Sequence, residues 1–446
     1  MAAVTHLSNL CFSNGSMETT ARSNQPSMAS SLLVAGTIRR KAFPGCRIIG
    51  KWKPLHCRPM STGRTAAQTT PPSSSPTLTY PWLMLPPVLE SDSTTAAYKF
   101  YSLGEKRVVT LTCEGAAREV TASGDVMVFT GSSHGWVGLW NPHTHDMFLY
   151  NPISRRHIKL PPFHQLPNYN HDSVWDSVGV EKIILSSTPD DEACRAVIIY
   201  KLDGMMAFCC PGRPNDTWAP MGDPLGPPDD GINPAGSYSD CVYSPGHGLF
   251  FALTKYYNLE CWDLQDPCSP VSTRVADDLR LQPKPTTRLA VMGRDILFVT
   301  PHTTDVVDLE GLCWVDSMDY GLRFYKPFPY PLTIDFDVDR YDPEEGGGDL
   351  VRCSSLGNWA LFVGARSHAV ALPVAQLPGL RPNSIYFTDM ECTEVFENDQ
   401  LINGHDSGIF YYEKKTVSPC YYPVDVRRLK KIFPAPMWFF PSLASN

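Results

Sequence analysis

The stretch that most constrains the fold of this chain is residues 131–163, GSSHGWVGLWNPHTHDMFLYNPISRRHIKLPPF. It contains two Asn-Pro pairs and ends near a Pro-Pro pair. Asn-Pro favours a turn because proline fixes φ and the Asn side chain can bond its own backbone. Between the turns, apolar residues alternate with others, which is the period of half-buried strands. We therefore predict three short antiparallel strands, at 134–140, 146–150 and 157–160.

Three strands of this length are too small to be stable alone, so they must be one unit of a larger β assembly. Similar short strands, separated by turn clusters, follow from Tyr80 onward, and no long helix is predicted. Groups of three or four strands recur at roughly 45 to 60 residues, near the blade period of β-propellers. The further predicted strands are 98–103, 107–112, 125–130, 180–185, 196–202, 205–209, 240–243, 249–254, 259–264, 288–291, 295–300, 333–341, 359–363, 369–372, 384–388 and 408–412.

No residue motif repeats cleanly with these groups. Gly246-His247 and Trp262-Asp263 have the residue types of the WD40 signature, but they lie too close together and occur once. We therefore predict an all-β fold, a monomeric β-propeller of six or seven blades over residues 79–446, that is not of the WD40 type.

Residues 1–78 have the composition of an organelle transit peptide followed by a flexible linker. They are rich in Ser, Thr, Ala and Arg, nearly free of acidic residues, and have no long apolar segment of the secretory kind. A second Met, Met28, opens a basic amphipathic pattern and is an alternative start. The first 21 residues lack Arg and Lys, which suits a plastid peptide better than a mitochondrial one. A disordered basic tail is the other interpretation.

Charge is divided unevenly along the chain. The whole chain carries −8, but Met1–Arg64 contains nine basic residues and one acidic residue, so the remainder carries −16. An acidic body repels phosphate backbones, which argues against nucleic acid as a partner. No apolar run approaches the length of about 18 residues that a membrane-spanning helix needs. The 14 Cys residues form no C-x-x-C pairs, which argues against a zinc site or a disulfide framework.

Four stretches make the chain resemble the plant F-box-associated KIB-type β-propeller family. In chain order they are PWLMLPP (81–87), the opening stretch to Pro162, SLGNWALFVGARSHAVALP with GLRPNSIYFTD (355–373 and 379–389), and PMWFFPSL (436–443). They span essentially the whole folded region. The resemblance implies a propeller whose loops contact a partner.

Many members of that family begin with an F-box, a helical module that docks onto a ubiquitin-ligase adaptor. The residues before Pro81 contain no leucine-periodic helical segment and have a transit-like composition instead. The chain therefore resembles an organelle-directed subset that lacks the F-box. This puts a ligase role in doubt, since no such adaptor is expected inside mitochondria or plastids.

Two motifs match the first residues of known functional sites, but the sequence around each motif lacks what the site requires. Gly131-Ser132-Ser133-His134-Gly135 matches G-x-S-x-G, but a nucleophile elbow needs a helix after the Ser, and here a strand is predicted. We interpret it as a tight turn. Asp335-Phe336-Asp337-Val338-Asp339 begins like a calcium loop, but Arg340 replaces the turn Gly and Gly346 the closing Glu. Alternation predicts solvated carboxylates on one strand face, opposite Ile334, Phe336 and Val338.

The turns of the opening stretch carry the candidate contacts for a partner. His143 and His145 lie in one turn and Arg155 and Arg156 in the next, and rigid scaffolds usually carry function on loops. Metal binding needs a third convergent ligand, and the spacing of His157, His164 and His171 supplies none. We predict solvated turn histidines and no metal or cofactor.

The last basic cluster, Arg427-Arg428-Leu429-Lys430-Lys431, precedes Trp438, Phe439 and Phe440. Basic and stacking residues together are a feature of RNA binding, but this cluster is too short to be diagnostic. We predict instead that this ending forms a last strand packed into the closing blade.

These observations predict a non-enzymatic interaction scaffold, imported into the mitochondrion or alternatively the chloroplast, that binds a protein. A cytosolic or nuclear location is the less favoured alternative. Two further functions stay open: a substrate receptor of a ubiquitin ligase, and an enzyme with a site in the propeller channel, where propellers often place them by analogy.

Overall fold

The computed structural model describes residues 81–89, 96–112, 128–141, 144–167, 179–200, 204–222, 237–276, 286–303, 332–342, 350–377, 379–390, 406–418 and 436–441. The chain divides into two units, Met1–Pro72 and Ser73–Asn446, and every described residue lies in the second. The predicted transit peptide and linker, His143 and the basic cluster 427–431 lie outside the described residues.

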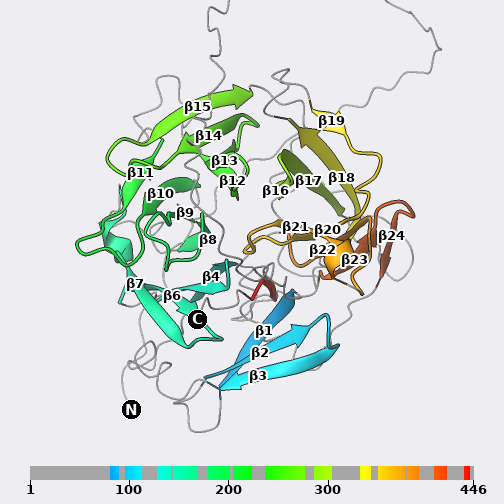
Figure 1. Cartoon of the computed structure of the whole chain (residues 1–446), viewed down its shortest axis with the longest axis horizontal. Helices are drawn as coiled ribbons and strands as arrows, with labels where there is room; N and C mark the ends of the chain where they lie inside the picture. Colours follow the sequence, from blue (N-terminus) through cyan, green and yellow to red (C-terminus); the bar gives the residue numbers. More distant parts are fainter. Residues whose placement is uncertain are drawn as a thin grey trace, which may run out of the picture. The chain divides into compact units, whose positions relative to one another are not determined.

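Three four-stranded antiparallel sheets follow one another along the chain, each with its strands in chain order (Figure 1). We number them blades 2, 3 and 4. Blade 2 contains β4 (Val128–Ser133), β5 (Trp136–Trp140), β6 (Met147–Asn151) and β7 (Arg156–Leu160). Blade 3 contains β8 (Val180–Leu185), β9 (Ala196–Tyr200), β10 (Met205–Cys209) and β11 (Ala219–Met221). Blade 4 contains β12 (Tyr238–Ser244), β13 (Leu249–Thr254), β14 (Leu259–Asp263) and β15 (Val271–Ala276).

The next nine strands form one sheet that consists of two blades. Blade 5 contains β16 (Arg288–Met292), β17 (Asp295–Thr303), β18 (Thr333–Tyr341) and β19 (Val351–Arg352). Blade 6 has the order β21 (Val370–Pro373), β20 (Trp359–Val363), β22 (Ser384–Phe387), β23 (Gly408–Tyr411) and β24 (Thr416–Ser418). The two blades join at a single parallel pair, Val291 with Val370.

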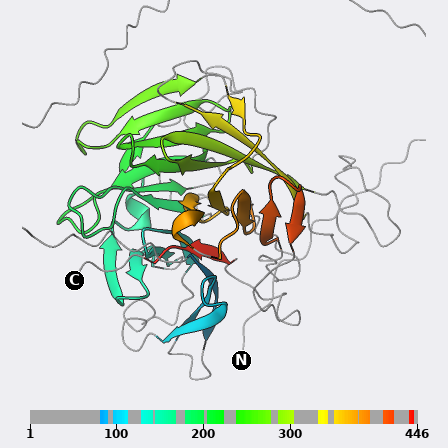
Figure 2. The same cartoon turned by 45° about the vertical axis from the view of Figure 1, so that its right-hand side comes forward.

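Blade 1 unites the two ends of the described chain. Its order is β25 (Met437–Phe439), β1 (Trp82–Leu89), β2 (Ala96–Ser102) and β3 (Arg107–Thr112). In Figure 2, β25 is drawn in red, and the register pairs Leu83 of β1 with Trp438 of β25. The described strands therefore form six blades, which confirms the predicted all-β propeller. It also confirms that the family-like ending packs as the closing strand.

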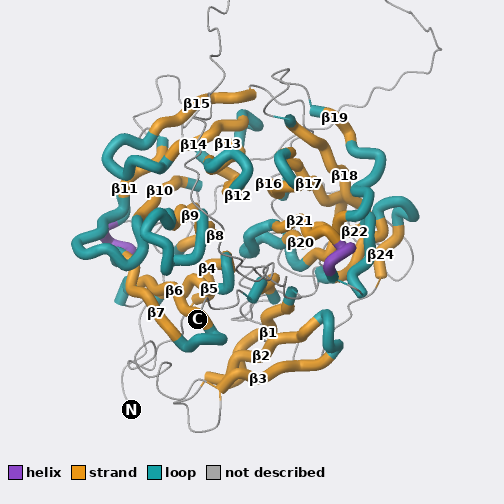
Figure 3. The backbone as a smooth tube through the Cα atoms, viewed as in Figure 1, coloured by secondary structure: helices purple, strands orange, loops and turns teal. Residues whose placement is uncertain are grey.

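The described residues contain little helix. Figure 3 shows the strands in orange and two short helices in purple, which are the 3₁₀ turns η1 (Phe163–Gln165) and η3 (Val374–Gln376). Among the described residues, no helix is long and apolar enough to cross a membrane.

The opening stretch folds nearly as predicted, because its turns are determined locally. The Asn141 side chain accepts the Thr144 amide at 3.1 Å, and Asn151 accepts the amides of Ile153 and Ser154 at 3.0 Å. The first strand begins two residues later than predicted. His134 and Gly135 have φ of 51° and 79°, so they form the two-residue hairpin turn that joins β4 to β5.

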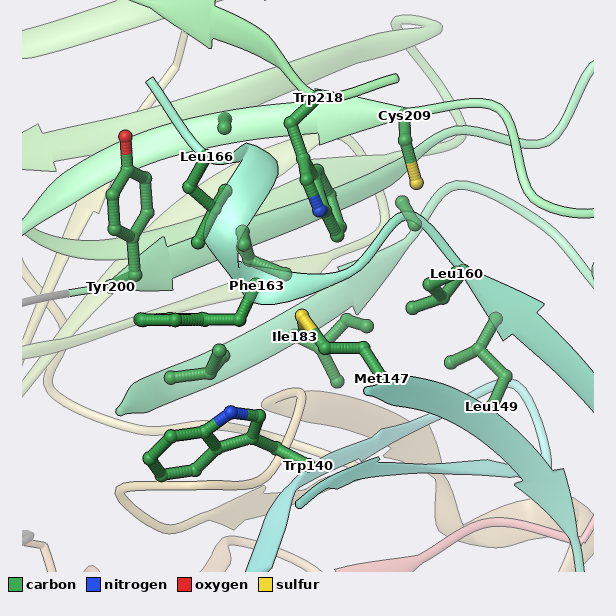
Figure 4. Close-up of a cluster of buried hydrophobic side chains, with 14 of the residues drawn as sticks. Trp140, Met147, Leu149, Leu160, Phe163, Leu166, Ile183, Tyr200, Cys209 and Trp218 are labelled. Atoms are coloured by element: carbon green, nitrogen blue, oxygen red, sulfur yellow. The ribbon is translucent and has the colours of Figure 1, made fainter. Parts of the chain in front are cut away.

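Blades 2 and 3 share a core across their facing sheets. Figure 4 shows the large buried side chains from blade 2 and η1 meeting those from blade 3. The indole N–H of Trp218 donates to the Pro161 carbonyl at 2.8 Å, and the Tyr200 hydroxyl donates to Pro167 at 3.0 Å. The members labelled in the figure are Trp140, Met147, Leu149, Leu160, Phe163, Leu166, Ile183, Tyr200, Cys209 and Trp218.

Trp438 closes the ring through contacts with three segments. Its side chain is fully buried, and its indole N–H donates to the Val363 carbonyl at 3.1 Å. Its backbone N–H donates to the Ser367 hydroxyl at 2.9 Å, and its carbonyl accepts the Ser132 hydroxyl at 2.5 Å. β25 thus joins blade 1 to blade 2 and to blade 6.

Trp438→Ala should lower the free energy of unfolding by about 3–5 kcal/mol, because it leaves a large cavity and removes a buried hydrogen bond. The matched control is Val271→Ala, whose side chain is 55% exposed and should change stability by less than about 0.5 kcal/mol. Urea unfolding of both variants measures this, and equal midpoints would contradict the role of Trp438 in closure.

Candidate functional site

The innermost strands gather polar side chains around the propeller axis. β4, β8, β12 and β16 each open their blade and are followed by a hairpin, so they run in the same sense, and they lie nearest the centre of Figure 1. We call the end where these strands begin the amino end of the axis and the other end the carboxyl end. The segment 364–369 of blade 6 runs beside them: Ser367 forms an isolated parallel bridge with Ser132.

Ser133, His134 and His368 meet at the carboxyl end. The Ser133 hydroxyl lies 3.0 Å from Nδ1 of His134 and 3.2 Å from Nδ1 of His368, and it accepts the Leu185 amide at 3.1 Å. The two imidazole rings are 5.8 Å apart. One hydroxyl proton can be donated to only one Nδ1, so the other ring must carry its proton on Nδ1 and donate to the hydroxyl.

Burial keeps both imidazoles neutral. It lowers the pKa of His134 from 6.5 to about 4. Burial also lowers the pKa of His368 well below its ordinary value, and the neighbouring His134 and Lys182 lower it further. Desolvation disfavours the charged form of a histidine, and nearby cations add to that effect. At neutral pH the cluster is therefore a set of neutral hydrogen-bonding groups.

A buried ion pair lies deeper along the axis. Lys182 Nζ of β8 is 2.5 Å from Asp240 Oδ1 of β12, and both side chains are at most 3% exposed. The other oxygen of Asp240 accepts the Leu289 amide of β16 at 2.7 Å. One carboxylate thus connects the innermost strands of three consecutive blades.

A second carboxyl group, Glu181, lies near the amino end. Burial raises its pKa above the ordinary value, although Lys255, Arg288 and Arg366 act in the opposite direction. These cations come from the β13–β14 turn, the first residue of β16 and the axial segment of blade 6. The two ends of the axis therefore differ: neutral imidazoles lie at one and charged groups at the other.

The G-x-S-x-G motif is a hairpin and not a nucleophile elbow. Ser133 ends β4 and β5 begins at Trp136, so a strand follows the motif where an elbow requires a helix. Gly131 has φ of 136°, and a Cβ there would lie 2.6 Å from the Arg366 carbonyl oxygen. The first glycine of the motif is required because the axial segment approaches β4 closely.

The D-x-D-x-D motif lies on β18, as alternation predicts, but its carboxylates are paired with cations. Lys415 lies 3.1 Å from Asp335, Arg352 contacts both Asp337 and Asp339, and His302 lies 2.9 Å from Asp337. Burial raises the pKa of Asp337, but hydrogen bonds from Arg352 and His302 bring it below its ordinary value.

The prediction of solvated acids therefore holds only in part, because the Asp335 side chain is 40% exposed whereas Asp339 is buried. The predicted apolar face is also incomplete: Ile334 is 50% exposed, whereas Phe336 and Val338 are buried. Among the described residues, no group of three His, Cys, Asp or Glu side chains is placed to hold a metal ion.

The predicted partner contacts do not form one surface. His145 lies in the turn before β6 and Arg155 in the turn after it, so they lie at opposite ends of that strand. His145 is half-buried and stacks on Phe163 at 6.2 Å, unlike the solvated turn histidine that we predicted. Arg155 and Arg156 are exposed side by side. Arg156 pairs with Asp190 of the β8–β9 loop at 2.6 Å and lies over the Trp136 ring.

A family model, the KIB1-4 beta-propeller, matches residues 100–413, which is more than half of the chain. The chain belongs to the KIB1-4 β-propeller family. Its propeller blades, most of them four-stranded and antiparallel, agree with that membership. No curated protein matches the chain.

The chain is also similar to several solved structures, one of which is a β-propeller domain. The β-propeller domain of Cps50 (Swd1) from Myceliophteria thermophila has 10% identity and a TM-score of 0.29, with 63% of this chain and 87% of that chain covered. A putative 6-phosphogluconolactonase from Bacteroides uniformis has 12% identity and a TM-score of 0.29, with 61% and 66% covered. A chain of a nidogen/laminin complex has 7% identity and a TM-score of 0.35, with 81% and 99% covered. No functional conclusion follows from likenesses this distant.

The pH dependence of stability should report the half-buried His134 and the buried His368. The unfolded chain binds their protons near pH 6.5, whereas folded His134 binds its proton only near pH 4. The free energy of unfolding should therefore fall as the pH decreases from 6.5 toward 4, by up to about 3 kcal/mol for this residue.

His134→Asn removes this titration and still suits the left-handed φ, so it should flatten the pH dependence of the melting temperature. His164→Asn, at an exposed histidine, is the matched control and should leave the slope unchanged. Identical slopes for wild type and His134→Asn would show that His134 is not buried in its neutral form.

Removing one partner of the buried ion pair should be costly. We expect Lys182→Met to lower the free energy of unfolding by about 3–5 kcal/mol, because it leaves the Asp240 charge buried without its cation. The double variant Lys182→Met/Asp240→Leu should lose less than the sum of the two single losses. Arg156→Met, which breaks an exposed pair, is the control and should cost about 1 kcal/mol or less. Additive losses in the double-mutant cycle would refute the coupling.

Proposed function

We propose that this KIB1-4 propeller is a non-enzymatic scaffold that binds a protein partner inside an organelle, the mitochondrion first and the chloroplast as the alternative. The observation that carries the proposal is that the polar side chains along the axis bond neighbouring blades to one another. The hydroxyl of Ser132 bonds the closing strand, that of Ser133 bonds β8, and Asp240 connects blades 3, 4 and 5.

With these groups engaged in holding blades together, the exposed turns are the natural place for partner contacts. Arg155 and Arg156 are such positions. Arg156 is held over Trp136 and beside Asp190, so its guanidinium loses little conformational freedom on binding. The proposal that the protein is imported into an organelle is supported by the basic, acid-poor composition of residues 1–78. The transit-like composition of residues 1–78 is also why we favour a scaffold over a ligase receptor.

The test is to purify the tagged full chain from isolated mitochondria and chloroplasts and to identify co-purifying proteins by mass spectrometry. We expect a stable partner whose recovery falls several-fold in Arg155→Glu/Arg156→Glu and is unchanged in Lys414→Glu, a control at another exposed turn. N-terminal sequencing of the same material should find a cleaved start near residues 60–78. An uncleaved cytosolic protein that captures a ligase adaptor would refute the proposal.

A further inference from the structure

The hydroxyl of Ser133, at the carboxyl end of the axis, uses all of its hydrogen-bonding capacity. It accepts the Leu185 amide at 3.1 Å, and Nδ1 of His134 and Nδ1 of His368 lie 3.0 and 3.2 Å away. A hydroxyl has one proton and two lone pairs. The amide takes one lone pair, one Nδ1 takes the proton, and the Nδ1–H of the other ring takes the second lone pair. Both Nδ1 atoms are therefore engaged by Ser133.

This arrangement determines which of the two outer ring nitrogens, Nε2, carries a proton. A neutral imidazole has one N–H and one bare nitrogen, and burial keeps both rings neutral because it lowers the pKa of each. The ring that donates from Nδ1 has a bare Nε2, which is an acceptor. The ring that accepts at Nδ1 has its proton on Nε2, which is a donor. The two rings therefore present one donor and one acceptor, whichever ring has which role.

Both Nε2 atoms are accessible to a ligand. Within the described part of the chain, the side-chain hydrogen bonds of His134 and His368 are those with Ser133. Neither Nε2 is among the buried side-chain atoms of that part that lack a hydrogen bond, so both reach solvent. The exposure of the rings agrees with this, because His134 is half-buried and His368 is 8% exposed.

The chemistry of the two rings favours a neutral ligand. Lys182, the cation that acts on His368, is already paired with Asp240 at 2.5 Å. Two donors suit a carboxylate and two acceptors suit an ammonium group, whereas one donor beside one acceptor suits a carboxamide, which has a C=O and an N–H. The ring centroids are 5.8 Å apart, so a ligand that engages both rings is served better by two polar atoms than by one.

We propose that Nε2 of His134 and Nε2 of His368 form a binding site for a carboxamide group, and that Ser133 gives the two rings their complementary protonation. The bare Nε2 accepts the amide N–H, and the protonated Nε2 donates to the carbonyl oxygen. Proton exchange with solvent and rotation of the Ser133 hydroxyl interchange the two roles, so the group can bind in either orientation. The site lies at the axis and does not depend on the partner contacts at Arg155 and Arg156.

The probe is acetamide, titrated at neutral pH into the full chain with isotope-labelled histidine and followed by NMR of the ring nitrogens. Without ligand, we expect one ring protonated on Nδ1 and the other on Nε2, or the average of the two patterns if they exchange rapidly. Acetamide should shift both Nε2 signals until they saturate. Acetate and methylammonium should bind about tenfold more weakly, because each leaves one Nε2 without its complement.

Two variants test the roles of the residues. His134→Asn removes one ring and should weaken acetamide binding about tenfold. Ser133→Ala should reduce the preference for acetamide over acetate several-fold, because both rings can then carry Nε2–H. His164→Asn, at an exposed histidine, is the matched control and should change neither quantity. Circular dichroism melts confirm that each variant is folded.

A short peptide with one Gln, compared with the same peptide carrying Glu, distinguishes the source of the carboxamide. Tighter binding of the Gln peptide than of acetamide supports the site with a polypeptide side chain as ligand, and equal binding supports it with a small molecule. The proposal is overturned if both rings are fully protonated on the same nitrogen or if acetamide shifts neither ring. It is also overturned if folded His134→Asn binds acetamide as tightly as wild type.

Discussion

The closure of the ring depends on Trp438. β25 has three residues, so its ladder with β1 supplies few backbone hydrogen bonds, yet it must hold together segments more than 350 positions apart in the chain. Bringing such distant ends together carries a loop-closure entropy that grows only slowly with length. The fully buried indole with its bond to Val363, and the backbone bonds of Trp438 with Ser367 and Ser132, offset that cost. A short closing strand therefore suffices, because its three side chains are buried, with Met437 and Phe439 in the core beside Phe100 and Trp438 in the core of blade 6.

Closure alone does not align the blades, and the axial polar groups provide that alignment. Apolar contacts between facing sheets are non-directional and tolerate sliding, whereas the Lys182–Asp240 pair is satisfied in one geometry only. A buried ion pair gains little net stability over apolar residues, because desolvation costs nearly as much as the attraction returns. Its physical consequence here is specificity: Asp240 can reach Lys182 and the Leu289 amide together only when three blades are in register.

The features that sequence predicts well are those determined within a few residues. The Asn141 and Asn151 turns and the bounds of β18 follow from local chemistry, and the strands lie within two residues of where we expect them. The axial cluster was not predictable, because Ser133 and His368 are 235 positions apart and no local pattern marks either as a partner of the other. The cation partners of the β18 carboxylates were not predictable for the same reason, since Lys415 lies 80 positions from Asp335. The parallel pairing of β20 with β22 also departs from the simple meander that hairpin signals indicate.

One physical effect accounts for the different chemistry at the two ends of the axis. Burial favours the neutral form of every ionisable group, so it lowers the pKa values of His134 and His368 and raises that of Glu181. At the carboxyl end nothing opposes this effect: the histidines have each other and Lys182 as neighbours, which add to it. At the amino end, cations from three blades oppose it. The two ends of the axis therefore differ in charge: neutral imidazoles lie at the carboxyl end, and near the amino end cations oppose the effect of burial on Glu181.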